Sequence, residues 1–132
     1  MIILDASALA DWLLGTPRLG TAVAARIRDA RILHTLDVAF VEVVGAVRSK
    51  LLRGELSSRR GVEAVSDLLA TPIRQHEAAP LAPRVWALRE THSAYDAAYV
   101  ALAEVLRMPL LTTDRRLARS HGHTAQIIDA SS

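Results

Sequence analysis

The chain has no cysteine, which rules out disulfide bonds and thiolate metal ligands. It also has no apolar run near the roughly 18 residues that a membrane-spanning helix needs. The first residues lack the basic stretch that opens a signal peptide, and Asp5 and Asp11 interrupt the apolar run that follows. These absences favour a soluble protein of the reducing cytoplasm that has no contact with a membrane.

Lysine is nearly absent, because Lys50 is the only one among sixteen basic residues and the others are arginines. With fourteen acidic residues the formal net charge is +2, which is weak evidence for nucleic-acid binding. If four carboxylates surrounded a metal ion, the remaining surface would carry a charge of about +6. Arginine forks suit phosphate, although the base composition of a genome explains the same bias.

The 132 residues fit one domain spanning 1–132, and no linker, repeat or low-complexity segment divides them. Short apolar runs alternate with helical patterns along the chain. Strands are expected at 2–4, 31–35, 72–77, 109–113 and 126–128, and helices at 6–14, 19–30, 37–53, 57–70, 81–91, 93–106 and 115–120. This alternation predicts an α/β protein, with three α/β/α layers around a mostly parallel central sheet.

Two of the expected helices carry informative patterns. In helix 37–53, an apolar stripe is expected along one face, and Gly54 ends the helix. This stripe comprises Phe40, Val44, Val47 and Leu51. Helix 93–106 is apolar on nearly every side from Ala97 to Leu106, so we expect it to be central and buried.

Two aspartates directly follow expected strands. Asp5 comes after the strand at 2–4, and Asp114 comes after Leu110-Leu111. Ligands of open α/β sheets bind at the carboxyl ends of the strands. If the two strands are parallel, both carboxylates therefore arrive at the same edge of the sheet.

Two further acids lie in helices with apolar surroundings. Glu42 shares its helix face with small residues such as Gly45 and Ala46, so both faces of the first half of this helix are expected to be buried. Asp96 shares its face with Tyr99 and Val100. An unpaired buried carboxylate costs several kcal/mol or becomes protonated, and a bound cation would remove that cost.

Each acid also has a simpler interpretation. Asp5 and Asp114 precede helices and match N-cap residues, which contribute about 1 kcal/mol each. Asp96 follows Ser93 by three residues, as in a capping box. Glu42 could pair with an arginine such as Arg48 or Arg26.

A metal site made of these acids would contain only oxygen ligands. Such sites suit Mg²⁺ or Mn²⁺, whereas Zn²⁺ usually takes nitrogen or sulfur. The five histidines show no zinc-like pairing on a helix face, and His121-Gly-His123 is typical of a solvated turn. The pattern therefore favours magnesium or manganese over zinc.

Four stretches together resemble the PIN-domain family, and within it the VapC toxins of bacterial type II toxin–antitoxin pairs. They are residues 2–9 (IILDASAL), 42–43 (EV), 95–103 (YDAAYVALA) and 111–117 (LTTDRRL). Each motif alone is loose, but four in this order and at these separations form a specific pattern. The resemblance runs from residue 2 to about residue 128.

The resemblance implies a PIN-like fold and a metal-dependent endoribonuclease whose products carry a 5′-phosphate and a 3′-hydroxyl. The acidic quartet that binds one or two Mg²⁺ or Mn²⁺ ions corresponds to Asp5, Glu42, Asp96 and Asp114. Ser7 and Thr112 match the hydroxyl residues that support this quartet. Some relatives carry a further acid after the last aspartate, where this chain has Arg115 and Arg116. This chain therefore lacks the acid that would serve a second metal position.

The expected partners are an RNA substrate, a cognate VapB-like antitoxin and a second copy of the chain. Trp12 and Trp86 are candidates for core or interface anchors, with the core preferred for each. Arg115 and Arg116, or the arginines between Arg48 and Arg60, are candidate contacts for RNA, although they also fit solvated helix faces.

Two other functions remain open. One is a catalytically silent domain that only binds RNA or a protein. The other is an aspartyl-phosphate phosphatase with Asp5 as nucleophile. Phosphatases of that kind usually have a second aspartate two residues later, where this chain has Ser7.

Overall fold

Five short parallel strands form one sheet in the order β3-β2-β1-β4-β5. The computed structural model describes residues 1–132, and its strands are β1 (Ile2–Leu4), β2 (Leu33–Leu36), β3 (Ile73–His76), β4 (Leu110–Thr112) and β5 (Ile127–Asp129). All five expected strands are present, with ends shifted by one or two residues. The predicted α/β architecture with a parallel sheet is confirmed.

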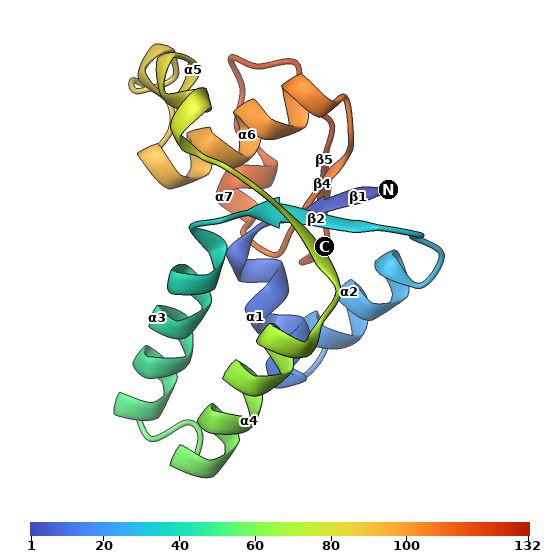
Figure 1. Cartoon of the computed structure of the whole chain (residues 1–132), viewed down its shortest axis with the longest axis vertical. Helices are drawn as coiled ribbons and strands as arrows, with labels where there is room; N and C mark the ends of the chain where they lie inside the picture. Colours follow the sequence, from blue (N-terminus) through green and yellow to red (C-terminus); the bar gives the residue numbers. More distant parts are fainter.

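Helices cover both faces of this sheet (Figure 1). They are α1 (Ala6–Leu14), α2 (Leu19–Ile27), α3 (Ala39–Leu52), α4 (Ser58–Ala70), α5 (Ala82–Ala87), α6 (Ala94–Leu106) and α7 (Arg115–Ala118), with a 3₁₀ turn, η1 (Ala79–Leu81), before α5. Helices α1 to α4 gather below the sheet in Figure 1, and α5 and α6 lie above it. No helix is both long enough and apolar enough to cross a bilayer.

The strand order reverses next to β1. The chain runs outward from β1 to β2 and β3, and then returns to place β4 on the other side of β1. In open α/β sheets the crevice at such a reversal, at the carboxyl ends of the strands, is where ligands bind. Here this crevice lies between the ends of β1 and β4, where Asp5 and Asp114 follow their strands.

Helix ends coincide with residues suited to capping. The hydroxyls of Ser57 and Ser93 accept hydrogen bonds from the N–H groups of Arg60 and Asp96 at the starts of α4 and α6. Gly15, with a φ of 61°, ends α1 in the left-handed conformation that glycine adopts without steric cost. These boundaries agree with the expected ones.

Helix α6 is the most deeply buried helix of the chain, as its sequence predicts. Every residue from Ala97 to Ala103 is buried, so the helix has no solvent-exposed face over two turns. Helix α6 carries Asp96 in its first turn and the buried Tyr99 three residues later.

The expected apolar stripe on α3 is only half right, because Val47 is buried and Phe40 packs against the core, whereas the other two members are exposed. The helix buries Ala39, Val43 and Val47, whereas Val44 and Leu51 are 44% and 37% exposed. The first half of the helix is apolar on several sides, so periodicity alone did not distinguish the face that packs against α1 and α4.

The expected helix at 81–91 is too long, because only Ala82–Ala87 form an α-helix. It consists of η1, the six-residue helix α5 and a series of turns that reach Thr91. The N–H of Leu88 is shared between the carbonyls of Arg84 and Val85, which tightens the chain and ends α5. Trp86 on α5 is 68% exposed, so the preference for a core position is wrong for this residue, whereas Trp12 packs against the core.

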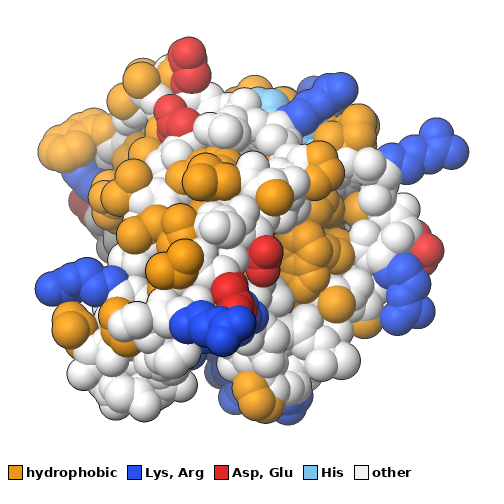
Figure 2. All heavy atoms as spheres, turned by 60° about the horizontal axis from the view of Figure 1, so that its bottom comes forward, with side chains coloured by type: hydrophobic (Ala, Val, Ile, Leu, Met, Phe, Trp, Pro, Cys, Tyr) orange, Lys and Arg blue, Asp and Glu red, His pale blue; other side chains and the backbone are white.

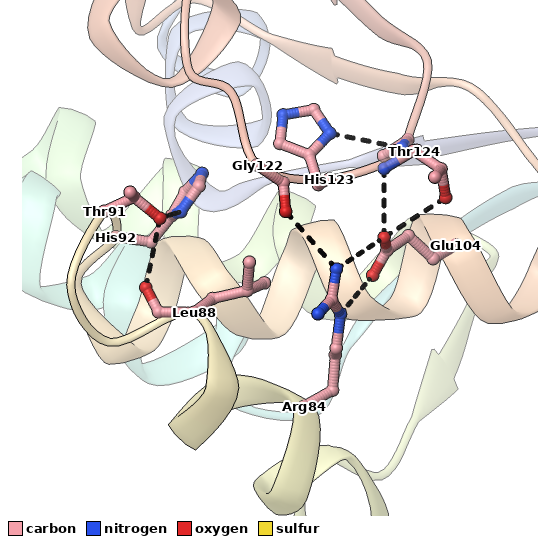
Figure 3. A network of polar contacts seen from close by, with 9 residues as sticks. Arg84, Leu88, Thr91, His92, Glu104, Gly122, His123 and Thr124 are labelled. Atoms are coloured by element: carbon pink, nitrogen blue, oxygen red, sulfur yellow. Dashed lines mark hydrogen bonds and ion pairs between the residues drawn. The ribbon is translucent and has the colours of Figure 1, made fainter.

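A polar network ties the outer face of α6 to its neighbours (Figure 3). The Arg84 guanidinium of α5 donates to both carboxylate oxygens of Glu104 on α6, at 2.8 and 3.0 Å. The N–H and hydroxyl of Thr124 donate to Glu104 Oε2 at 3.0 and 3.2 Å. One carboxylate thus fixes α5 and the segment before β5 to the helix that carries Asp96.

Candidate active site

Asp5 lies at the carboxyl end of the central strand and is only 4% exposed. Its N–H donates to the carbonyl of Leu111, which fixes its backbone to β4. Its Oδ1 accepts hydrogen bonds from the Ser7 hydroxyl at 2.7 Å and the Ala8 N–H at 2.9 Å. Its Oδ2 accepts one from the Thr112 hydroxyl at 2.5 Å. Asp5 is therefore an N-cap, as the simpler interpretation held, and also a buried, firmly oriented carboxylate.

The two hydroxyls that resemblance assigns to support the site both contact Asp5. Each hydroxyl has one proton, and both protons point to the Asp5 carboxylate. The Thr112 oxygen in turn accepts the N–H of Asp114 at 3.0 Å, and the Ser7 oxygen accepts that of Thr113 at 3.3 Å. Thr112 thus connects the two aspartates that follow β1 and β4.

Glu42 is half-buried in the first turn of α3. The Tyr99 hydroxyl of α6 donates to its Oε1 at 2.9 Å, and no arginine forms an ion pair with it. The suggested pairing with Arg48 or Arg26 is therefore wrong. The expectation that both faces around Glu42 are buried is also wrong, because Gly45 is exposed.

Asp96 and Asp114 each lie at the start of a helix. Asp96 is in the first turn of α6, where the Ser93 hydroxyl accepts its N–H at 3.2 Å. Asp114 caps α7, since its Oδ1 accepts the N–H groups of Arg116 and Leu117 at 2.9 and 3.4 Å. Capping thus explains part of the placement of these residues.

The four carboxylates influence one another electrostatically. Burial raises the pKa of Asp5 to about 6, with a smaller contribution from the charge of Asp96, although its hydrogen bonds act in the opposite direction. Burial also raises the pKa of Glu42, and the charges of Asp5 and Asp96 add to this. The pKa of Asp96 is raised by burial and then by the charge of Asp114. Negative charge is therefore concentrated where the sheet order reverses.

The donor chemistry of this cluster fits a divalent cation. Its side chains offer only carboxylate oxygens, which hard ions such as Mg²⁺ and Mn²⁺ prefer, and a cation would offset the burial and repulsion that raise these pKa values. In the side-chain conformations described here, no three acids or histidines converge closely enough to enclose an ion. The reason lies in their other partners, since Glu42 points to Tyr99 and Asp114 to backbone N–H groups.

Tyr99 is a residue of this cluster that the sequence did not assign to it. Its signal was present, because it lies one helical turn after Asp96 on the same face of a helix otherwise lined with aliphatic residues. His34 and His76 contact each other across β2 and β3, with 2.9 Å between Nδ1 and Nε2.

Comparisons with known proteins agree with this fold. The PIN domain model matches residues 2–121. Ribonuclease VapC12 of Mycobacterium tuberculosis is 46% identical over 127 residues, which cover 96% of this chain and 97% of that protein. PAE2754 of Pyrobaculum aerophilum has a TM-score of 0.73 at 22% identity and covers 98% of this chain and 83% of its own. VapC20 of M. tuberculosis, a toxin that cleaves the sarcin–ricin loop, has a TM-score of 0.68 at 20% identity. The match covers 94% of this chain and 97% of VapC20. This chain belongs to the PIN-domain family.

Proposed function

We propose that this chain is a divalent-metal-dependent endoribonuclease and the toxin of a toxin–antitoxin pair in the bacterial cytoplasm. The observation that carries this proposal is Asp5, a buried carboxylate with a pKa of about 6 that shares its surroundings with Glu42 and Asp96. Such a cluster is costly unless it holds a cation. Similarity to VapC ribonucleases supports RNA as the substrate.

In the proposed site, Asp5, Asp96 and Asp114 bind Mg²⁺ or Mn²⁺, and Glu42 is a further ligand or orients the attacking water. When bound, the metal lowers the pKa of a water molecule and offsets charge on the scissile phosphate. The chain's own residues prepare this arrangement. Ser7 and Thr112 fix the rotamer of Asp5, and Tyr99 fixes that of Glu42.

The two alternatives differ from this proposal in ways that the structure helps to judge. An aspartyl-phosphate phosphatase with Asp5 as nucleophile usually has a second aspartate two residues later, where this chain has Ser7, whose hydroxyl donates to Asp5. A silent binding domain would gain nothing from keeping a buried carboxylate with a raised pKa. Neither alternative is favoured by a specific observation.

Cleavage of RNA by the purified chain tests the proposal. We expect cleavage with Mg²⁺, none with EDTA, and a loss of about a hundredfold or more for Asp5→Asn and Asp96→Asn, because several kcal/mol of transition-state stabilisation disappear. Asp67→Asn, which changes an exposed acid of α4, is the matched control and keeps full activity. Metal-independent cleavage, or wild-type rates in both site variants, would overturn the site assignment. Release of phosphate from a small ester instead of RNA cleavage would favour the phosphatase.

We also propose that the chain forms a homodimer and binds a VapB-like antitoxin that presents a basic side chain to the acidic cluster. Two exposed apolar surfaces support protein partners. One is a groove of about 510 Å³ beside α5 and α6, whose wall includes Val38, Trp86 and Tyr95. The other lies on α3 and α4, which Figure 2 brings forward, where hydrophobic side chains lie exposed among scattered charges. The large exposed ones on these two helices are Val41, Val44, Leu51, Leu52, Val62 and Leu69.

The mass of the purified chain in solution tests the dimer. We expect a dimer at micromolar concentration that Trp86→Arg or Leu69→Arg converts to a monomer, depending on which surface carries the contact. A monomeric wild-type chain at these concentrations would overturn the dimer proposal without affecting the nuclease proposal.

A further inference from the structure

A hollow lined only by polar and charged residues lies beside α7 and adjoins the acidic cluster. Its wall is formed by Thr91, Arg115, Arg116, Arg119, Ser120 and His121, and its volume is about 560 Å³. No hydrophobic side chain contributes to it. We call it the α7 hollow.

The arginines of this hollow differ in how they are engaged. Arg115 is held by the end of the chain, since its Nε donates to the Ser131 hydroxyl at 3.2 Å and its Nη2 to the Ser131 carbonyl at 3.4 Å. The guanidinium groups of Arg116 and Arg119 have no hydrogen-bond partner and no ion pair. Both side chains are exposed. The hollow therefore presents two uncommitted cations.

Four of the other twelve arginines are engaged with acids. Arg53, Arg59, Arg60 and Arg84 each pair with a glutamate. Asp129 is the acid within electrostatic reach of Arg119, since its pKa is lowered first by the Ser131 hydroxyl and, among smaller causes, by the charges of Arg115 and Arg119. Its Oδ1 accepts the N–H and hydroxyl of Ser131 at 2.8 and 2.5 Å, and it forms no ion pair with Arg119.

The α7 hollow continues toward the acidic cluster. A second, smaller hollow of about 260 Å³ shares Thr91, Arg116 and Ser120 with it and includes Asp96 in its wall. Arg116 is close enough to Asp96 that its positive charge partly offsets the upward shift of the Asp96 pKa. A flexible anion that leaves Asp96 along this surface meets Arg116 first and Arg119 next.

We propose that the α7 hollow is a phosphate subsite, which binds a non-scissile phosphodiester of the RNA strand whose scissile bond lies at the carboxylates. This inference rests on the proposed ribonuclease function and adds where the strand runs. Guanidinium forks match the geometry of phosphate oxygens and keep their charge at any physiological pH. A single-stranded backbone carries one such anion per nucleotide, so the subsite takes RNA irrespective of its bases.

Binding of a short single-stranded oligoribonucleotide in EDTA tests this subsite without any cleavage. We expect Arg119→Gln and Arg116→Gln to weaken binding about fivefold to tenfold at low salt, and Arg119→Lys to weaken it less. The slope of log K against log salt should fall by roughly 0.7 for each lost phosphate contact. The matched control is Arg28→Gln, which removes the same charge from an exposed arginine at the end of α2, ahead of the amino end of β2.

Neutral methylphosphonate linkages placed one at a time along the oligonucleotide identify the phosphate concerned. One linkage should weaken binding to the wild type and have no further effect on Arg119→Gln. Equal losses for Arg119→Gln and Arg28→Gln, or methylphosphonate effects that are independent of Arg119, would overturn the subsite. The nuclease proposal fails separately: in that case RNA binding would depend on Arg119, but the chain would not cleave RNA.

Discussion

Asp5 is held by three donors, yet its pKa lies at about 6 because burial outweighs them. At neutral pH the metal-free protein therefore has an ionised carboxylate in a place that favours the protonated form. Since its pKa in the unfolded chain is near 3.8, the folded state is favoured by this group below pH 3.8. That advantage is lost as the pH rises through 6.

We predict that Asp5→Asn stabilises the metal-free protein at pH 7.5. Removing a pKa shift of about two units stabilises the folded state by about 3 kcal/mol, whereas losing the hydrogen bond that the amide cannot accept destabilises it by about 1 kcal/mol. The expected gain in the free energy of unfolding is thus about 1 to 2 kcal/mol, measured by urea denaturation in EDTA. At pH 4 the gain should disappear. A variant that is less stable than the wild type at both pH values would show that the buried charge of Asp5 does not destabilise the metal-free protein.

Tyr99 offers a second prediction at the scale of single residues. Tyr99→Phe removes the one donor to Glu42 while keeping the buried ring, so unfolding should become easier by about 1 kcal/mol. If the hydroxyl orients Glu42 for catalysis, kcat for RNA cleavage should fall about tenfold with little change in KM. Tyr95→Phe, at a residue that is 57% exposed, is the control. An unchanged kcat in Tyr99→Phe would limit this tyrosine to a packing role.

Single residues also show how much of the site could be predicted from the sequence. Asp5 and Asp114 were predicted from their positions after two strands, which needs only the parallel topology. Their capping bonds were predicted as well. The Tyr99–Glu42 hydrogen bond was not, because it joins two residues on different helices, 57 positions apart in the chain. Periodicity within one helix carries no information about which side chains of two helices meet.

Among the elements, α6 matters most because it carries Asp96 and Tyr99. Its inner face is held by packing and its outer face by Glu104, whose partners come from α5 and the segment before β5 (Figure 3). The hydrogen bonds from Arg84, followed by those from Thr124, lower the pKa of Glu104 to about 2. This network is therefore an acid-sensitive part of the fold.

We predict that Glu104→Gln lowers the free energy of unfolding by about 2 kcal/mol at pH 7. The pKa shift alone corresponds to about 3 kcal/mol, but solvent screens a pair in which the Arg84 side chain is 40% exposed. Since the folded pKa lies below the unfolded value of 4.5, this stability is present above pH 4.5 and is lost as the pH falls toward 2. In thermal unfolding, the difference in melting temperature between Glu104→Gln and the wild type should be smaller at pH 3 than at pH 7. The half-exposed Glu63, changed to Gln, should have little effect at either pH.

The elements that the sequence predicted best were those with unambiguous patterns. Helix α6 is apolar all round and proved central, and Gly15 ends α1 as expected. Helix α3 and the segment around α5 were predicted less well. In α3 more than one apolar stripe was available, and the end of α5 depends on turns whose residues are not distinctive.

At the scale of the whole molecule, the site exists because the strand order reverses beside β1. Alternating strands and helices predicted a parallel sheet, but they did not fix the order of its strands. That order brings together chain segments more than a hundred residues apart, as the Thr112–Asp5 hydrogen bond shows. The expectation that all four acids form one site came from the resemblance to the PIN-domain family, because local patterns could not supply it.

The central claim is that carboxylates from β1, α3, α6 and β4 surround a divalent cation. Mn²⁺ binding, followed by electron paramagnetic resonance and calorimetry on the purified chain, tests it most directly. We predict that the wild type binds at least one Mn²⁺ per chain and is stabilised by it, whereas Asp96→Asn, with an unchanged circular dichroism spectrum, binds none at the same concentrations. A wild-type chain without affinity for Mn²⁺ or Mg²⁺, or an Asp96→Asn variant that binds as tightly as the wild type, would contradict the account.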